Sequence, residues 1–505
     1  MDPQRQGQRQ TVSELPMRQA TPPSNASKRR RRVVLLSTVA AVAILVACSW
    51  VARYWAWRQE LQAAGFVGEM SPPGSGDRVL VVAPHPDDET LGCGGVIQEA
   101  VARGAEIHVA LMTNGDASEL AVILGERELR LTPTAFIELG RKRQQESLRT
   151  LTSFGVPASH IHFLGFPNNG LTALWRLEHW PYSRLYRAPR TRVSLSPYRG
   201  TVTPHAPYCG QQVLSDLTAV LHQVQPNLIF VTDAQDIHPD HWATCCFLRY
   251  ALETIAVRGA AWARSAQVYG YLIHWPGYPL PARVAPRLQL LPPPRLIEAG
   301  GEWLRLPLSL ELSRRKLTAI RGYHTQDPSF DRLLLRFARA NETFELLPTP
   351  GLEIGGAIRF RNEHGHRRRL GGVEMAGLRL AVSEQLTISA EVESSRRPIA
   401  RGAYIALDVR GWDERGAPVV TTIYEETGGI VRAMRLDEIE VANLRIGARV
   451  QRGRLEIPRL PLPPQGLAQR ELFVTCWGSV RDRAIDSAVV TPVRLHSPGG
   501  GDEGQ

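Results

Sequence analysis

Two short loops hold the residues whose types and spacing could do chemistry. One reads His85-Pro86-Asp87-Asp88-Glu89 and the other reads Asp236-Ile237-His238-Pro239-Asp240-His241. In each loop two potential metal ligands stand three positions apart, a spacing that brings both to one side of a helical turn. Two histidines and a carboxylate suit a catalytic zinc site, which keeps one position open for water. One such loop alone would be weak evidence, but two together predict a metal site.

The elements that must position these loops are buried strands and the helices that follow them. Apolar runs at Val79–Ala83 and Asn227–Thr232 precede the two loops and are typical of parallel strands. Open α/β sheets bind their ligands at the carboxyl ends of such strands. Charged side chains are rarely buried unless they are paired or bound to a metal. The competing interpretation is that the Asp and His side chains only cap two helices.

Strand and helix patterns alternate over residues 78–347, which predicts a Rossmann-like, mostly parallel sheet with helices on both faces. Residues 172–209 break this alternation and are expected to form an irregular insertion, and residues 275–300 a proline-rich loop. Further strands are predicted at 106–113, 160–166 and 267–274, and helices at 90–103, 136–154, 211–223, 241–257 and 312–323.

A different texture begins at residue 348, where short strand patterns alternate with turn residues. Strands are expected within 378–392, 403–412, 419–424, 454–457 and 471–477. This pattern predicts a β-sandwich domain over residues 348–495, an ordinary size for such a domain. Residues 496–505 are expected to be a disordered tail.

The amino-terminal segment predicts a membrane anchor. Residues 1–32 form a polar tail that ends in the basic run Lys28–Arg32, and residues 33–52 then carry no charge. A helix needs roughly 20 apolar residues to cross a bilayer. The basic run would stay in the cytoplasm, so the chain beyond the linker 53–77 is expected outside it, as in a single-pass protein of the inner membrane.

Two other interpretations of this segment remain. A buried helix is disfavoured by the five adjacent cations, and a cleaved signal peptide is the other alternative. Leu45-Val46-Ala47-Cys48 also resembles a bacterial lipobox, which would make Cys48 a lipidated first residue. The uncleaved anchor and the lipidated form both tether the protein at the membrane.

Composition argues against a nucleic-acid partner. The net charge is +11, but only three of the 60 basic residues are lysine, and the arginines are spread along the whole chain. No basic stripe with interleaved aromatic residues appears. The six cysteines do not form a disulfide framework. No feature of the sequence indicates an oligomeric state.

Taken together, the two loops resemble the PIG-L/LmbE family of zinc-dependent N-acetylglucosamine deacetylases. The resemblance covers roughly residues 78–346 and includes the glycine-rich helix start after Glu89, the segment Arg143–Glu146, Lys316 and Gln326. The two histidine motifs together are specific, whereas the other positions are looser.

The resemblance implies a role for each site residue. His85, Asp88 and His241 would bind Zn²⁺, and Asp87 would be the general base for the attacking water. His238 would stabilise the oxyanion and help to protonate the leaving group, with Asp240 orienting it. Arg143 would contact the sugar. In the family an aspartate usually grips a sugar hydroxyl after the third strand, and here Asn168 stands in that turn.

These residues suit amide hydrolysis, because zinc polarises a carbonyl, a carboxylate accepts a proton and a histidine stabilises developing charge. The sequence therefore predicts a membrane-anchored zinc hydrolase that deacetylates an N-acetylated amino sugar of an envelope glycan, polysaccharide or glycolipid. The alternatives are a non-catalytic glycan-binding envelope protein and a metal-dependent hydrolase of another acyl amide.

Overall fold

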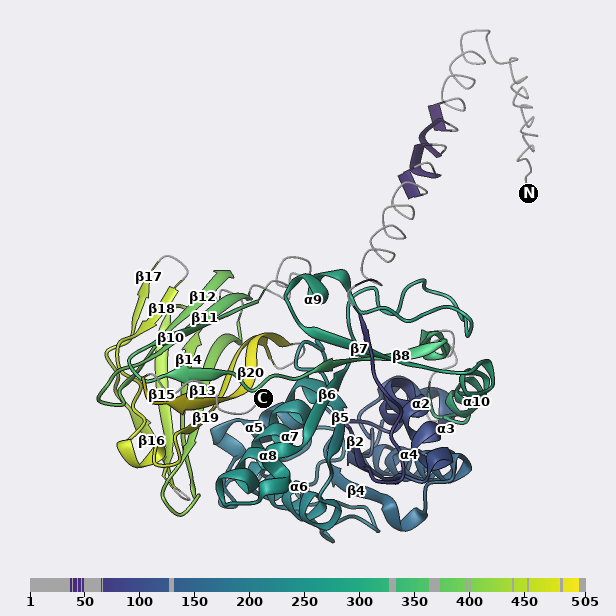
Figure 1. Cartoon of the computed structure of the whole chain (residues 1–505), viewed down its shortest axis with the longest axis horizontal. Helices are drawn as coiled ribbons and strands as arrows, with labels where there is room; N and C mark the ends of the chain where they lie inside the picture. Colours follow the sequence, from purple (N-terminus) through teal and green to yellow (C-terminus); the bar gives the residue numbers. More distant parts are fainter. Residues whose placement is uncertain are drawn as a thin grey trace, which may run out of the picture. The chain divides into compact units, whose positions relative to one another are not determined.

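The structure is a computed structural model of the chain (Figure 1). It describes residues 67–126, 131–326, 333–362, 373–396, 401–437, 440–451, 454–481 and 485–498, together with residues 65 and 398 and ten positions between 37 and 49. The chain divides into two compact units, Met1–Gln62 and Ala63–Gln505. The following paragraphs concern the second unit, except where the first is named.

The described positions of the first unit are helical, at scattered places between residues 37 and 49. The predicted tail 1–32 and the rest of the predicted anchor 33–52 lie outside the described residues, as does most of the linker 53–77. In the part of the chain that the structure describes, no helix combines the length and the apolar character needed to cross a membrane.

An eight-stranded sheet organises the α/β part, in the order β1-β7-β8-β6-β5-β2-β3-β4. All neighbouring strands are parallel except at β8, which runs antiparallel to β6 and β7. Along the chain, strands are added on one side of β2 and then on the other, so the order reverses between β2 and β5. The strands are β1 (Gly68–Glu69), β2 (Arg78–Ala83), β3 (Glu106–Thr113), β4 (Ile161–Phe166), β5 (Leu228–Thr232), β6 (Gln267–Tyr271), β7 (Glu302–Pro307) and β8 (Asn341–Leu346).

Helices cover both faces of this sheet, as predicted (Figure 1). Val79 and Val81 of β2 belong to the apolar core shared with α2, α4 and α10, whereas Leu80 and Val82 belong to the core shared with α5, α6 and α7. Successive side chains of a strand point to opposite faces, so a strand buried on both faces is apolar throughout. The helices are α2 (Asp88–Arg103), α3 (Glu119–Glu126), α4 (Pro133–Phe154), α5 (Leu171–Trp175), α6 (Gly210–Val224), α7 (Pro239–Val257), α8 (Ala261–Ser265), α9 (Pro294–Glu298) and α10 (Leu310–Ile320), with short 3₁₀ turns at Ala158–His160, Leu177–His179, Leu335–Phe337 and Pro464–Gly466.

Several elements differ from the sequence-based expectation, among them α3, α9, β15 (Ile430–Asp437) and β20 (Ile485–His496), which were not predicted. The predicted irregular insertion begins with the short helix α5, and β7 and β8 extend the sheet where no strand was predicted. The closing helix α10 is held against this extension by Lys316, whose ammonium donates hydrogen bonds to Glu342 on β8 and to the carbonyl of Leu91.

The carboxyl-terminal part forms β sheets, as the strand patterns indicated. One has the order β10-β11-β12-β18-β17 and the other β16-β15-β14-β13-β19-β20-β9, and the two enclose a common apolar core. The strands are β9 (Gly351–Glu353), β10 (Ala357–Arg361), β11 (Glu374–Val382), β12 (Ile388–Arg396), β13 (Ala403–Trp412), β14 (Pro418–Glu426), β15 (Ile430–Asp437), β16 (Glu440–Leu444), β17 (Arg449–Gln451), β18 (Arg454–Ile457), β19 (Glu471–Val480) and β20 (Ile485–His496).

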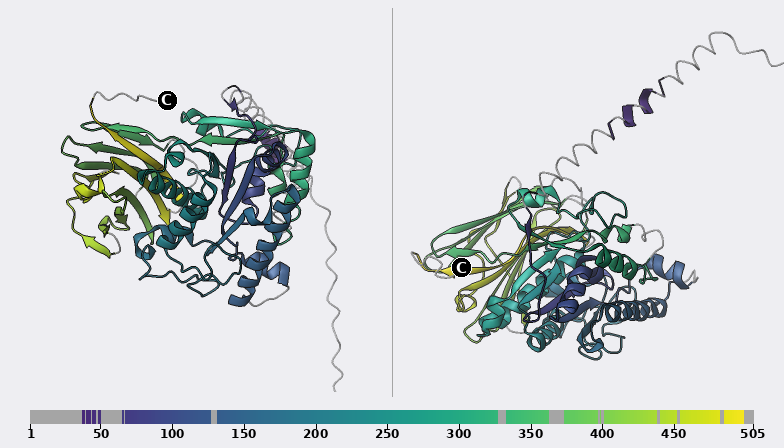
Figure 2. Two further views of the ribbon diagram at one scale, coloured as in Figure 1. Left: turned by 60° about the horizontal axis from the view of Figure 1, so that its bottom comes forward. Right: turned by 45° about the vertical axis from the view of Figure 1, so that its right-hand side comes forward.

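The seven-stranded sheet also packs against the α/β part through α7 (Figure 2). Side chains of β13 alternate between two cores: Leu407 packs inside the β sheets, whereas Ala406 packs with the helices. A buried guanidinium joins the two parts, because Arg410 lies 3.4 Å from the ring centre of Trp175 and donates a hydrogen bond to the Trp175 carbonyl. The boundary predicted at residue 348 therefore crosses a shared apolar core.

Candidate active site

The two predicted loops meet at the carboxyl ends of β2 and β5, the neighbouring strands between which the sheet order reverses. Such a reversal is where open α/β sheets bind their ligands. β2 ends at Ala83, and α2 begins at Asp88 after the turn 84–87. β5 ends at Thr232, and α7 begins at Pro239. The sheet thus brings together side chains that lie more than 150 residues apart in sequence.

Two of the three predicted metal ligands, His85 and His241, lie close to a carboxylate oxygen of the third, Asp88. Oδ2 of Asp88 lies 3.0 Å from Nδ1 of His85 and 3.1 Å from Nε2 of His241. All three residues are buried. The Nε2 atom of His241 has no hydrogen-bond partner, although it is close to Asp88, because the contact lacks hydrogen-bond geometry. A buried nitrogen left in this way fits a metal-binding role better than a structural one.

The electrostatics of this cluster favour positive charge. Burial by itself lowers the pKa of His241, but the carboxylates of Asp236 and Asp88 outweigh burial and raise that pKa to about 10. Burial acts in the same direction on His85, and its hydrogen bonds to Asp240 and Asp88 raise the pKa to about 9. A divalent cation would satisfy the same carboxylates, so the donor set fits a metal ion.

Each predicted histidine ligand has a carboxylate behind it. Oδ2 of Asp240 lies 3.2 Å from Nε2 of His85, and Oδ2 of Asp236 lies 3.1 Å from Nδ1 of His241. Contacts of this kind fix the orientation of a metal-binding imidazole and the tautomer that it adopts. They leave Nδ1 of His85 and Nε2 of His241 facing Asp88.

The contact of Asp240 corrects one prediction from the sequence. Asp240 was expected to orient His238, but its carboxylate accepts backbone hydrogen bonds from Asn169 and Leu171 and faces His85. The physical reason is that α7 starts here, so the side chain of Asp240 points across the sheet edge to the loop after β4. The ring of His238 is instead oriented by a backbone hydrogen bond, because its Nδ1 atom accepts the N–H of Asp240.

His238 sits beside the predicted ligands and also caps α7. Its ring centre lies 4.9 Å from those of His85 and His241. Burial and the neighbouring charge of His85 hold the pKa of His238 well below its usual value. Because Nδ1 accepts a hydrogen bond, the proton of the neutral ring is on Nε2. The capping interpretation therefore describes part of what His238 does.

Asp87 does not cap its helix. Its side chain makes no capping hydrogen bond, and its backbone has φ = 119°, a conformation that costs a non-glycine residue energy. The carboxylate of Glu89 accepts the Asp87 N–H at 2.9 Å and is itself held by Ser147 and Tyr323. Burial and the charge of Asp88 raise the pKa of Asp87 well above its usual value. This strained, supported position is typical of a functional site.

The predicted sugar contacts lie at the neighbouring strand ends. Arg143 on α4 is buried and donates hydrogen bonds to the carbonyl of Gly115 and to Gln326, while its Nε has no partner. Oδ1 of Asn168, after β4, is also buried without a partner. Unsatisfied buried polar atoms beside a metal cluster suit the recognition of hydroxyl groups.

Sequence reasoning assigned no role to three residues at this site. Asp236 was noticed in the second loop but not as a partner of His241. His274, just after β6, has its ring centre 4.7 Å from that of His241. Two sets of side chains could hold a metal ion: one is His85, His238 and His241, and the other is Asp88, His241 and His274. Asp116, after β3, accepts hydrogen bonds from Tyr198 and from the Asn168 N–H. The signal that could have identified these three residues is that each lies just after a strand of the sheet.

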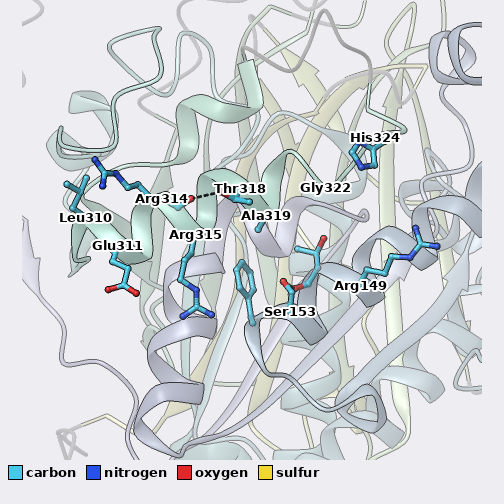
Figure 3. Close-up of a pocket in the computed structure, with 12 residues that line it drawn as sticks. Arg149, Ser153, Leu310, Glu311, Arg314, Arg315, Thr318, Ala319, Gly322 and His324 are labelled. Carbon is cyan, nitrogen blue, oxygen red and sulfur yellow. Dashed lines mark hydrogen bonds between the residues drawn. The ribbon is translucent and has the colours of Figure 1, made fainter.

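A separate groove lies between α4 and α10, with a volume of about 880 Å³. Three arginines line it, but Arg149 points away from Arg314 and Arg315, which lie on α10 (Figure 3). The guanidinium groups therefore do not gather around one point. None of the predicted site residues lines this groove.

Comparison with known proteins agrees with the geometry of the two loops. Residues 80–252 match the family described as PIG-L, GlcNAc-PI de-N-acetylase. This match covers part of the α/β region and about a third of the chain. The PIG-L match contains every site residue predicted from the sequence, since these residues lie between His85 and His241.

Two bacterial proteins are among the curated relatives of this chain. The 1D-myo-inositol 2-acetamido-2-deoxy-alpha-D-glucopyranoside deacetylase of Mycobacterium sp. (strain KMS) is 30% identical over 191 residues, which cover 37% of this chain and 51% of that protein. The protein of the same name from Mycolicibacterium smegmatis is 31% identical over 169 residues, or 33% and 50% of the two chains. The chain thus spans about half the length of these relatives.

Solved structures also resemble the chain at low identity. The N,N'-diacetylchitobiose deacetylase from Pyrococcus horikoshii is 19% identical, with a TM-score of 0.32, and the match covers 54% of this chain and 83% of that chain. The conserved protein TT1542 from Thermus thermophilus is also 19% identical, with a TM-score of 0.32, over 54% and 96% of the two chains.

Proposed function

We propose that this protein is a zinc-dependent hydrolase that removes the acetyl group from an N-acetylated amino sugar. The observation that carries the proposal is the position of Asp88, whose Oδ2 lies between Nδ1 of His85 and Nε2 of His241. Asp87, which caps nothing, stands directly beside this cluster. The PIG-L match over the same residues supports deacetylation as the reaction.

His85, Asp88 and His241 would hold the zinc ion. When bound, zinc polarises an amide carbonyl and makes a nucleophile available near neutral pH. Asp236 and Asp240 keep the two imidazoles in the orientation that presents a ligand nitrogen to Asp88. The arrangement accounts for the buried carboxylates of Asp88, Asp236 and Asp240, which apolar packing would not tolerate.

Asp87 and His238 would move the protons of the reaction. Asp87 would accept a proton from the attacking water as general base. His238 carries its proton on Nε2, because Nδ1 accepts the backbone N–H of Asp240. That proton can stabilise charge developing on the carbonyl oxygen and then pass to the leaving amine.

The substrate that we propose is a GlcNAc-type sugar within an envelope glycan, polysaccharide or glycolipid. The names of the curated relatives describe an N-acetylated amino sugar joined to inositol. Asn168 and Arg143 offer unpartnered polar atoms to sugar hydroxyls. Asn168 carries no charge, so the hydrogen bonds that it makes differ from those of an aspartate at the same turn.

Acetate release tests this proposal. Purified full-length protein loaded with zinc is incubated with N-acetylglucosamine, its disaccharide, its inositol conjugate and an N-acetyl amino acid, and acetate is measured. Release from sugars alone, lost in His241→Ala, is the expected result. Release from the amino acid would favour another amidase. Sugar binding without release would favour a non-catalytic glycan-binding protein.

We further propose that the protein is tethered at the inner membrane, with its catalytic part outside the cytoplasm and its carboxyl-terminal sheets forming a β-sandwich. Support for the tether is the charge-free segment 33–52 after the basic run Lys28–Arg32. A periplasm-active reporter fused after Gln505 is expected to be active. Activity of a cytoplasm-only reporter at the same point would contradict this arrangement.

A further inference from the structure

Trp242, the residue after the proposed ligand His241, is held by the carboxyl-terminal β sheets. Its side chain is fully buried. The indole Nε1 donates a hydrogen bond to Oγ of Ser487 on β20 at 3.3 Å, and its ring centre lies 4.7 Å from that of Trp477 on β19. Neighbouring residues in the first turn of α7 therefore have different roles. His241 is a proposed metal ligand, and Trp242 contacts the β sheets.

Strand β20 also contacts the loop that leads into α7. The backbone N–H of Ile485, at the start of β20, donates a hydrogen bond to the carbonyl of Ile237 at 3.2 Å. Ile237 separates Asp236, the partner of His241, from His238. The next residue of β20, Asp486, is anchored to β11 because its carboxylate accepts the N–H of Met375.

A register shift in the β19–β20 pairing occurs at this point. Trp477 pairs with Ser487, whereas Cys476 pairs with Val489. β20 thus has an extra residue here, and a bulge of this kind changes the direction in which nearby side chains point. Here the bulge lies beside the serine whose hydroxyl meets Trp242.

From these contacts we infer that Ser487 and Trp477 are positioning residues for the proposed metal site, acting through Trp242 on His241. The inference rests on the proposed function, since it concerns the ligand set of that function. In this arrangement the β sheets hold the first turn of α7 close enough to Asp88 for His241 and Asp88 to bind the same metal ion. Residues that hold a ligand directly are typically worth about 10- to 100-fold in metal affinity.

The chain contains a matched control for this contact. Trp412 on β13 donates its indole hydrogen bond to Oγ1 of Thr254 on α7 at 3.2 Å. This pair joins the same helix to the same sheet and is equally buried, but Thr254 lies near the far end of α7. Removing either hydroxyl deletes one indole–hydroxyl bond, and only one of the two is next to a ligand.

The experiment compares Ser487→Ala with Thr254→Val in the full-length protein. Zinc affinity is measured by competition with a chromophoric chelator, and melting temperature by calorimetry. We expect Ser487→Ala to weaken zinc binding about threefold to tenfold, less than the loss of a direct partner of a ligand. Thr254→Val is expected to bind zinc like the unmodified protein, with a similar decrease in melting temperature.

Equal zinc affinity in all three proteins would overturn the inference, and so would an equal loss in both variants, which would indicate general destabilisation. A chain that binds no zinc would overturn it together with the ligand assignment. A chain that binds zinc with the expected pattern and releases no acetate would count against the proposed reaction alone.

A double-mutant cycle checks the route through Trp242. Trp242→Phe keeps an aromatic ring against Trp477 and removes the N–H that Ser487 accepts. If the hydroxyl acts through this bond, Ser487→Ala adds little further loss of zinc affinity in the Trp242→Phe background. Fully additive losses would show that Ser487 acts by another route.

Discussion

Oδ2 of Asp240 lies 3.2 Å from Nε2 of His85, a residue 155 positions earlier in the chain. This contact joins the loop after β2 to the start of α7. Asp240 also accepts the backbone N–H groups of Asn169 and Leu171, so it links a third strand end to the same point. One carboxylate thus holds the proposed ligand His85 against the loop after β4.

Asp240→Asn is expected to weaken zinc binding by about 10- to 100-fold, because an amide holds the imidazole of His85 less well than a carboxylate. Zinc affinity by chelator competition checks this. Asp216→Asn is the matched control, since Asp216 is a buried carboxylate bound to Thr203 and Gln212. Unchanged zinc affinity in Asp240→Asn would favour the prediction from the sequence, in which Asp240 orients His238.

Asp87→Asn is expected to keep a full equivalent of zinc and to lose turnover by about 100- to 10,000-fold, the usual worth of a general base. An asparagine cannot accept the proton of the attacking water, but it caps a helix almost as well as aspartate. Metal analysis and acetate release are measured on the same sample. Near-normal turnover would reject the base assignment, and loss of zinc would mean that Asp87 and Asp88 exchange roles.

His241→Ala is expected to abolish stoichiometric zinc binding, whereas His274→Ala keeps it. Both histidines can be grouped with Asp88 as possible ligands. Only His241 has a carboxylate, Asp236, behind its ring at 3.1 Å, the arrangement typical of a metal-binding histidine. Metal content of the two purified variants decides between them, and zinc loss in His274→Ala would move the ligand set toward β6.

A chain of residues 53–348, which lacks the proposed membrane anchor, is expected not to fold into a soluble protein. It would expose aromatic side chains of α7 such as Trp242 and Tyr250, which pack against aromatic rings of the seven-stranded sheet. Leaving a large apolar side chain in water costs about 1.5–3 kcal/mol. Soluble yield and near-ultraviolet circular dichroism test this, with a chain of residues 53–498 as control. A soluble, cooperatively unfolding 53–348 chain would contradict it.

The sequence predicted the strand-end loops well because their signals are local. An apolar run that stops at Pro84 identifies β2, and glycine closes α2 at Gly104 in the left-handed conformation. β7 and β8 were missed because charged residues such as Arg305 and Glu342 interrupt their apolar pattern.

The partners of the site residues could not be predicted, because they depend on how distant segments pack. Asp236 and Asp240 look alike in sequence, and only the fold decides that one faces His241 and the other His85. Likewise, the sequence alone indicates that Arg410 is a surface residue, whereas the structure buries its side chain against Trp175.

The contact between Trp242 and Ser487 joins residues that are 245 positions apart. A ribosome adds about 5–20 residues per second, so the residues of α7 are synthesised many seconds before those of β20. Throughout that interval the ligand loops are complete in sequence but lack the brace at Ile237 and Trp242. In a newly made chain the proposed metal site would therefore gain this brace only at the end of synthesis.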